Sequence, residues 1–108
     1  MPILKREGLR LGKFVVRFHS EFFKDLGKLS KNDIEIFEAK KEKIKANPLR
    51  LKHLSGGSNC YREEITSNTR LIYYILGNEI WMLVIDKHDK AYRNFRKRLY
   101  SLKTRFSE

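Results

Sequence analysis

The sequence predicts a small α+β domain with the element order β-α-α-β-β-β-α, in which a helical hairpin precedes a small antiparallel sheet and a C-terminal helix follows it. Strand-like and helix-like apolar patterns fall in separate runs along the chain, which favours α+β over an alternating α/β fold. The length of 108 residues is that of one domain with one core. Hydrophobic residues make up 41% and aromatic residues 12% of the chain, which is enough for a packed interior.

The first 13 residues are expected to form a basic, glycine-punctuated leader, and a single domain is expected to occupy residues 14–108. The leader contains no apolar core segment, so it is not typical of a secretory signal. The longest apolar run, Ile80 to Ile85, has the length of a strand and not of a membrane span. We therefore expect a cytoplasmic protein that makes no membrane contact.

The N-terminal half predicts one strand and two helices. Phe14 to Phe18 is rich in β-forming residues and predicts the first strand. Ser20 is the expected N-cap of a helix over Glu21 to Leu29, where apolar residues recur three or four positions apart. The Ser30-Lys31-Asn32-Asp33 stretch should break this helix and cap a second one, which should end near Ala46 because the following Asn-Pro pair disfavours continuation.

The C-terminal half predicts three strands and one helix after a basic loop over Leu49 to Asn59. The strand signals lie at Cys60 to Thr66, Arg70 to Leu76 and Glu79 to Asp86. The Ser67-Asn68 and Gly77-Asn78 pairs predict two-residue hairpin turns, which require an antiparallel meander. The final segment, Lys90 to Lys103, carries apolar residues at helical spacing.

The charge of the chain limits its partners. Lys and Arg number 24 against 13 Asp and Glu, so the formal net charge is +11. Such a field attracts nucleic acid, an anionic membrane surface or an acidic protein. The single cysteine, Cys60, excludes an internal disulfide and a cysteine-based zinc site. The three histidines lie far apart without a carboxylate pattern, so we expect no metal and no other cofactor.

Four short stretches occur in a specific order and spacing. They are Leu51-Lys52-His53-Leu54-Ser55-Gly56, then Tyr61-Arg62 with Ile65-Thr66, then Arg70-Leu71-Ile72-Tyr73-Tyr74-Ile75, then His88 and Tyr92. Together they resemble the RelE/ParE superfamily of toxin–antitoxin systems, over roughly residues 14–102. The Lys-His-Leu-Ser-Gly stretch is most similar to the YoeB branch.

The resemblance implies a RelE-like fold and a toxin that cuts messenger RNA on the ribosome without a metal ion. It also implies an acidic cognate antitoxin, which wraps the toxin with a helix or a strand. Members of the ParE type are implied to inhibit a topoisomerase instead, and the fold does not separate the two activities. A catalytically degenerate, basic nucleic-acid-binding module is the third alternative.

Metal-free RNA cleavage needs a proton acceptor for the 2′-hydroxyl, a cation for the phosphorane and a proton donor for the leaving oxygen. Arg70 matches the catalytic arginine of the family motif and keeps its charge at any working pH. His88 matches the histidine of the YoeB-type C-terminal motif, and an imidazole suits general acid catalysis. The alternatives are a solvated arginine at a strand end and an exposed histidine in a turn.

The second strand departs from the family pattern. Arg62 and Glu64 share one face of an alternating strand, and Glu64 stands where a basic catalytic residue is expected. Glu64 is thus a general base, an ion-pair partner of Arg70 or an inactivating change. Leu49 stands near the carboxylate base of the YoeB pattern, so the resemblance does not assign the base. Asp89 stands about where RelE relatives carry an arginine, so a degenerate, weakly active enzyme is a further alternative.

The candidate RNA-binding residues lie in the basic loop, in the second strand and on the last helix. Lys52, His53 and Arg62 are expected to grip phosphates beside the glycine-rich loop, and Lys90 to extend that surface. The alternatives are a generic basic loop and a solvated helix face. Tyr92 matches the family's tyrosine, which either stacks on a base or packs in the core beside Phe95.

Overall fold

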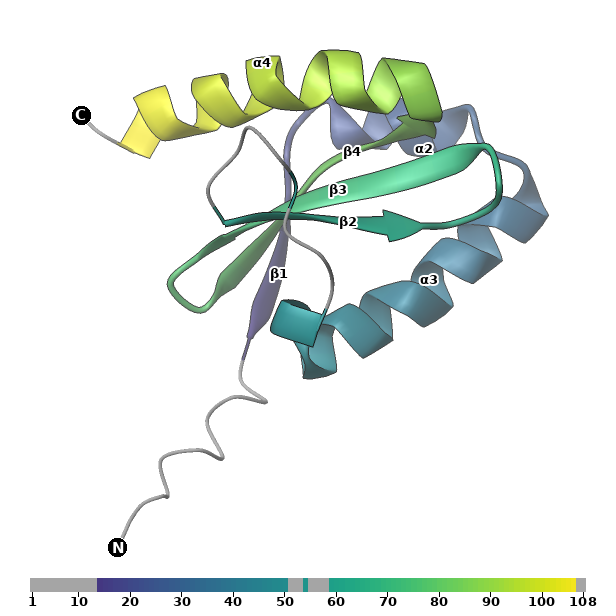
Figure 1. Ribbon diagram of the computed structural model, residues 1–108, viewed down its shortest axis with the longest axis horizontal. Helices are drawn as coiled ribbons and strands as arrows, with labels where there is room; N and C mark the ends of the chain where they lie inside the picture. The colour runs from purple at the N-terminus through teal and green to yellow at the C-terminus, as the bar shows by residue number, and fades with distance from the viewer. Residues whose placement is uncertain (1–13, 51–53, 55–58, 107–108) are drawn as a thin grey trace, which may run out of the picture.

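The chain forms a four-stranded sheet with helices on both faces (Figure 1). The computed structural model describes residues 14–50, 54 and 59–106. The predicted leader over residues 1–13, and with it Lys52, His53 and the glycines of the basic loop, lies outside the described residues. The elements confirm the predicted order and are β1 (Val15–Phe18), α2 (Phe22–Gly27), α3 (Lys31–Ala46), a short 3₁₀ helix η2 (Pro48–Arg50), β2 (Cys60–Glu64), β3 (Thr69–Leu76), β4 (Glu79–Lys87) and α4 (His88–Phe106).

The strand order in the sheet is β1-β4-β3-β2. Strands β2, β3 and β4 form the predicted antiparallel meander. Strand β1 completes the sheet by pairing with β4 in parallel, from Val15 opposite Glu79 to Phe18 opposite Met82. The crossover between them contains both N-terminal helices, as a parallel connection requires.

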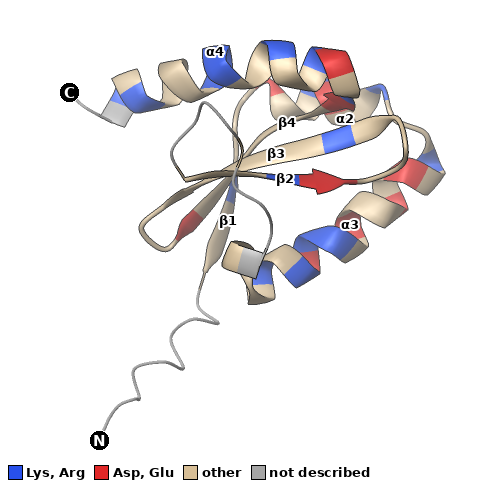
Figure 2. Cartoon of the chain, viewed as in Figure 1, with Lys and Arg blue, Asp and Glu red and all other residues tan. Residues whose placement is uncertain are grey.

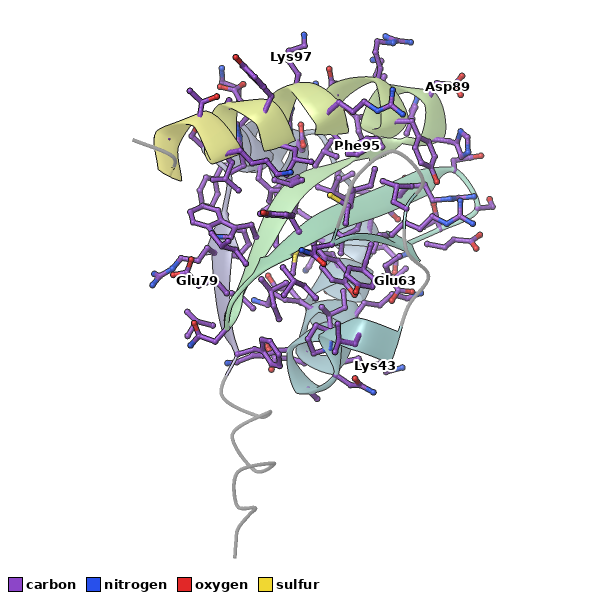
Figure 3. The ribbon with its side chains drawn as sticks, turned by 60° about the vertical axis from the view of Figure 1, so that its left-hand side comes forward. Lys43, Glu63, Glu79, Asp89, Phe95 and Lys97 are labelled. Carbon is purple, nitrogen blue, oxygen red and sulfur yellow. The ribbon has the colours of Figure 1, made fainter. Side chains whose placement is uncertain are left out.

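Each face of the sheet has its own apolar core. Helices α2 and α3 cover one face, where Phe22, Phe37 and Ile44 pack against strand side chains such as Tyr73. Helix α4 covers the other face with Ala91, Phe95, Leu99 and Leu102. Figure 3 shows Phe95 between α4 and the sheet, while Lys97 points away from the sheet. The side chain of a sheet residue therefore faces either the helical hairpin or α4.

A β-bulge changes the facing of strand β4. Ile72 pairs with Val84 and the next residue, Tyr73, pairs with Met82, so Leu83 is the extra residue. Met82 belongs to the core under the hairpin, whereas both Leu83 and Val84 belong to the core under α4. One inserted residue reverses the side-chain alternation beyond it. The bulge therefore reverses which side chains at the end of β4 face α4 and which face the helical hairpin.

Two local predictions need correction. The N-cap of α2 is Glu21, and no side chain caps this helix, so the expected Ser20 cap is wrong. The turn between β2 and β3 has Ser67 and Asn68 at its centre, as predicted, since the Thr69 N–H donates to the Thr66 carbonyl at 3.3 Å, but β2 ends at Glu64 and not at the predicted Thr66. Thr66 Oγ1 accepts hydrogen bonds from the backbone N–H of Asn68 and of Thr69, at 3.2 and 3.1 Å, and so organises the turn.

Other local predictions are confirmed by specific contacts. Ser30 caps α3 by accepting a hydrogen bond from the Asp33 N–H at 3.1 Å, and the helix ends at Ala46, before the Asn-Pro pair. Gly77 has φ of +60° in the β3–β4 turn, a conformation that glycine adopts without steric cost. Within the described part of the chain, no helix combines the length and the apolar character needed to cross a bilayer.

Candidate active site

Arg70 lies near the start of β3, and its side chain faces α4. Its neighbours on this face, Ile72 and Tyr74, belong to the core under α4, and alternation places Arg70 on the same side. Nη1 of Arg70 donates to the carbonyls of Thr66 and Ser67 at 2.9 and 3.1 Å. The side chain is 19% exposed, so it is neither freely solvated nor sealed in the core.

Two carboxylates flank Arg70 across the sheet. Glu64 is its register partner on β2, and Glu64 Oε2 lies 3.9 Å from Arg70 Nη2. Asp86 is its partner on β4. Directly opposed residues in an antiparallel pair project to the same face, so the bulge in β4 is what brings Asp86 to this side. Figure 2 shows the acidic end of β2 beside the basic segment of β3.

Arg62 lies on the same face as Arg70, on the neighbouring strand. It pairs in register with Ile72, so Arg62 and Arg70 are diagonal neighbours. Such residues have Cα atoms about 7–8 Å apart. The side chains of two arginines therefore project from neighbouring positions on one face of the sheet, and Glu64 projects beside them.

Tyr92 connects the sheet to His88. Arg62 Nη1 donates a hydrogen bond to the Tyr92 hydroxyl at 2.9 Å. The rings of Tyr92 and His88 meet edge to face, with centroids 4.7 Å apart. These contacts join β2 to the first turn of α4 and place His88 on the same side of the sheet as Arg62 and Arg70.

His88 is exposed and has a carboxylate beside it. Its side chain is 55% exposed, and Nδ1 lies 3.2 Å from Oδ1 of Asp89. Its backbone N–H donates to the carbonyl of Asn68 at 2.9 Å, which ties the start of α4 to the β2–β3 turn. No hydrogen bond or ion pair joins His88 to Arg70, although both lie on one face at the same end of the sheet.

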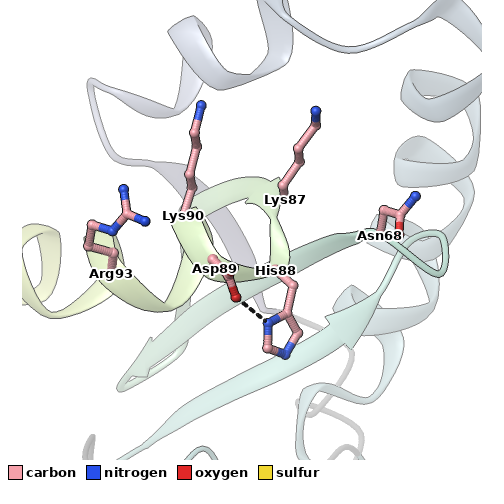
Figure 4. Close-up of a pocket in the computed structure, with 6 residues that line it drawn as sticks. All are labelled: Asn68, Lys87, His88, Asp89, Lys90 and Arg93. Carbon is pink, nitrogen blue, oxygen red and sulfur yellow. Dashed lines mark hydrogen bonds and ion pairs between the residues drawn. The ribbon is translucent and has the colours of Figure 1, made fainter.

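A depression of about 420 Å³ adjoins His88 (Figure 4). The described residues that line it are polar or charged: Asn68, Lys87, His88, Asp89, Lys90 and Arg93. Lys90 was a predicted RNA-binding residue, and the depression is where the structure places it. In the described residues, no group of three or more histidines, cysteines or carboxylates is arranged to hold a metal ion.

A histidine–serine pair on another side of α4 does not form a nucleophilic dyad. His19 Nδ1 accepts a hydrogen bond from the Glu21 N–H at 3.1 Å, so in the neutral ring the proton sits on Nε2. Nε2 then donates to Ser101 Oγ, 3.3 Å away, and cannot take the proton of the hydroxyl. Burial, followed by the Arg98 cation, lowers the pKa of His19 and keeps the ring neutral.

The structure brings together Glu64, Arg70, Arg62, His88 and Tyr92, while Lys52 and His53 lie outside the described residues. Tyr73 and Tyr74 belong to the core and not to the site, since they are 0% and 7% exposed. Sequence reasoning missed Asp86, because only the bulge turns it toward Arg70. It also missed Lys87, although the spacing of Lys87, Lys90 and Arg93 signals one side of a helix.

Comparison with known proteins supports the fold. No family model and no curated protein sequence matches the chain. A doubly substituted form of the Escherichia coli toxin RelE in the free state matches with a TM-score of 0.70 and 21% identity, over 79% of this chain and 96% of that one. A chain of the intact E. coli RelBE toxin–antitoxin complex matches with a TM-score of 0.64 and 20% identity, over 68% and 95%. A chain of the RelB–RelE antitoxin–toxin complex from Methanococcus jannaschii matches with a TM-score of 0.60 and 22% identity, over 73% and 98%. As the resemblance predicted, this protein has the fold of the RelE toxins.

Proposed function

We propose that this protein is the toxin of a type II toxin–antitoxin system, and that it cleaves messenger RNA on the ribosome without a metal ion. The observation that carries the proposal is the contact chain from Arg62 through Tyr92 to His88, on the sheet face that also bears Arg70 and Glu64. The RelE-type fold supports the class of toxin. The three chemical roles of RNA cleavage are then assigned to neighbouring side chains.

Arg70 and Arg62 supply the cations for the phosphorane. The described hydrogen bonds of Arg70 all use Nη1, and Nη2 has only the long 3.9 Å contact with Glu64, so Nε and Nη2 can bind phosphate oxygens. The turn carbonyls orient the guanidinium before substrate arrives, which lowers the cost of reorganisation during the reaction. An arginine can hold a phosphate with two parallel hydrogen bonds, which a lysine cannot reproduce.

His88 is the candidate general acid for the leaving 5′ oxygen. Asp89 accepts from Nδ1–H, so Nε2 is the nitrogen that faces substrate. In the imidazolium form, Nε2–H is the proton that the leaving oxygen receives. The edge of the Tyr92 ring limits rotation of the imidazole. Asp89 and Tyr92 thus orient the acid without touching the reacting atoms.

Glu64 is the candidate general base for the 2′-hydroxyl. Its side chain is 61% exposed, and its carboxylate lies beside Arg70, where the attacked phosphate would be held. A carboxylate beside a phosphate-holding cation is placed to take a proton from the adjacent 2′-hydroxyl. Cleavage then yields a 2′,3′-cyclic phosphate on one fragment and a free 5′-hydroxyl on the other.

We also propose that an acidic cognate antitoxin controls this activity. The net charge of +11 favours an acidic partner, and solved structures with the same fold include antitoxin–toxin complexes. Messenger RNA in the ribosome is the proposed substrate, and the cytoplasm is therefore the proposed location. No cofactor is needed for this reaction, because the 2′-hydroxyl is the nucleophile.

Purified protein with translating ribosomes, read out by mapping of transcript ends, tests the proposal. We expect the wild type to cut messenger RNA and Arg70→Ala to lose nearly all cleavage. Arg70→Lys keeps the charge but cannot hold the phosphate through two parallel hydrogen bonds. It should therefore cut at least tenfold more slowly, which corresponds to about 1.4 kcal/mol in the activation barrier. The control is Arg105→Ala, at an exposed position of α4. If wild-type protein cuts nothing, or if Arg70→Ala cuts as well as Arg105→Ala, the proposal is wrong.

A further inference from the structure

We propose that Lys87, Lys90 and Arg93 form a second phosphate-binding subsite, which holds the single-stranded RNA backbone next to the cleavage point. The proposal rests on the ribonuclease function proposed above and extends it to the path of the substrate. The ligand is a backbone phosphodiester one or more nucleotides away from the bond that is cut.

The three cations share one depression. It measures about 420 Å³ and includes Asn68 and the candidate acid, His88, in its lining. Figure 4 shows the side chains of Lys87, Lys90 and Arg93 extending to one side of α4, while the His88 ring extends to the other. Among the described residues of the lining, Asp89 is the one carboxylate, and it lies beside His88 Nδ1 at 3.2 Å. Positive charge therefore dominates the depression.

These cations are not engaged in ion pairs with the described residues. Several other lysines are, since Lys24, Lys40 and Lys41 pair with glutamates at 3.3, 3.2 and 2.8 Å. Lys87, Lys90 and Arg93 are all exposed. A cluster of like charges that lack internal partners repel one another, and an external anion relieves that repulsion.

The spacing of the cations suits a chain of phosphates. Lys87 directly precedes α4, and Lys90 and Arg93 follow at intervals of three residues, which puts them on one side of the helix. Lys90 and Arg93 are separated by a helical rise of about 4.5 Å, and Lys87 lies before the first turn, so the cations line a track rather than a single point. The track begins next to His88, and an RNA held at the cleavage site would pass around the start of α4 to reach it.

The lining favours RNA over an acidic protein segment. A docking helix or strand needs apolar anchors that fill pockets, and the residues that the structure describes around this depression are all polar or charged. A phosphodiester needs only cations and hydrogen-bond donors, which Asn68 and the three cations supply. The track is therefore matched to a nucleic acid backbone and carries no information about base sequence.

The test compares two triple variants that each remove three positive charges. The first is Lys87→Gln/Lys90→Gln/Arg93→Gln, and the matched control is Lys31→Gln/Lys43→Gln/Lys45→Gln, at exposed positions of α3. The probe is a short, fluorescein-labelled RNA with 2′-O-methyl groups, which cannot be cut, and binding is followed by fluorescence anisotropy over a range of salt concentrations. A DNA of the same sequence and poly-glutamate serve as further probes.

We expect the first triple to weaken RNA binding at least tenfold and the control less than threefold. Each lost contact removes about 0.7 from the slope of log affinity against log salt, so the slope should fall by about 2. The DNA should respond as the RNA does, because phosphate contacts do not involve the 2′ position. Equal losses in both triples would mean that only the overall field acts, which overturns the subsite. A larger loss for poly-glutamate than for RNA would also overturn it, in favour of an acidic protein partner.

This binding readout separates the subsite from the ribonuclease proposal. If wild-type protein cuts no RNA but the first triple alone loses RNA binding, the depression binds phosphate and the cleavage proposal fails. If the wild type cuts RNA and the first triple binds as tightly as the control, the subsite fails and the cleavage proposal stands.

Discussion

Arg98 of α4 holds both carboxylate oxygens of Asp25 in α2, with Nη1–Oδ2 at 2.6 Å and Nη2–Oδ1 at 3.2 Å. The same two groups bind the backbone of β4. The Ile85 N–H donates to Asp25 Oδ2 at 3.1 Å, and Arg98 Nη1 donates to the Leu83 carbonyl at 2.8 Å. β1 ends at Phe18, opposite Met82. The ion pair therefore hydrogen-bonds to the backbone of β4 beyond the point where β1 stops pairing with it.

Breaking this ion pair should destabilise the fold strongly. The side chains of Arg98 and Asp25 are 13% and 2% exposed, so Asp25→Ala leaves a largely buried cation and a β4 backbone N–H without their partner. We expect a loss of about 3–5 kcal/mol in the free energy of unfolding, measured by urea denaturation.

The surface ion pair between Arg17 and Glu79 provides the control for this measurement. It spans 3.0 Å, but its side chains are 50% and 26% exposed. Arg17→Ala should therefore cost less than about 1 kcal/mol. Comparable losses in Arg17→Ala and Asp25→Ala would contradict the role given to the buried pair.

Removing the hydroxyl of Tyr92 should reduce RNA cleavage without unfolding the protein. Tyr92→Phe keeps the ring beside His88 but loses the hydrogen bond from Arg62. The exposed guanidinium of Arg62 is then no longer held in one position. Because Arg62 is exposed, this hydrogen bond contributes little to folding, and the urea midpoint should barely change. The misplaced cation should slow cleavage roughly tenfold, which corresponds to about 1.4 kcal/mol in the barrier.

The double variant Tyr92→Phe/Arg62→Ala checks that the two side chains act together. Since Arg62→Ala removes the donor of the same hydrogen bond, the double variant should cleave no more slowly than Arg62→Ala alone, within a factor of about two. Fully additive losses would show that Tyr92 acts independently of Arg62.

The stability of the fold should decrease as the solution becomes mildly acidic. The pKa of His19 is lowered from 6.5, first by burial and then by the Arg98 cation, so the unfolded chain binds a proton that the folded protein resists. The stabilisation is complete above pH about 6.5 and is lost as the pH falls toward the lowered pKa of the folded state.

His19→Asn should flatten this pH dependence, because Asn can still accept from the Glu21 N–H but does not titrate. The measurement is the urea midpoint of wild type and variant at several pH values between 7.5 and 5. Parallel curves for the two proteins would show that other groups cause the acid sensitivity.

Local patterns account for the elements that the sequence predicts well. Helix α3 ends where the Asn-Pro pair removes a donor and disfavours helical backbone, and its Ser30 cap needs only neighbouring residues. Strands β3 and β4 were predictable because Gly77 supplies the positive φ of their turn. Arg62 and Glu64 share a face because alternation is intrinsic to a strand.

Features that depend on distant residues could not be predicted in this way. Ser20 has the right chemistry for an N-cap, yet the chain leaves β1 through a turn in which the Phe22 N–H donates to the His19 carbonyl, and Glu21 takes the capping position. The extra residue in β4 has no local signal, although it decides that Asp86 lies beside Arg70. The Asp25–Arg98 pair joins residues 73 positions apart.

The sequence by itself determined the order of the elements, the excess of positive charge, and the positions of Arg70 near the start of one strand and of His88 directly after another, because propensity, alternation and charge are properties of short segments. Only the tertiary structure decided that Tyr92 joins Arg62 to His88, that the guanidinium of Arg70 is held by turn carbonyls, and that Lys87, Lys90 and Arg93 border one depression. The physical reason is that side chains from separate strands and helices meet only after the sheet register and the bulge have set their facing.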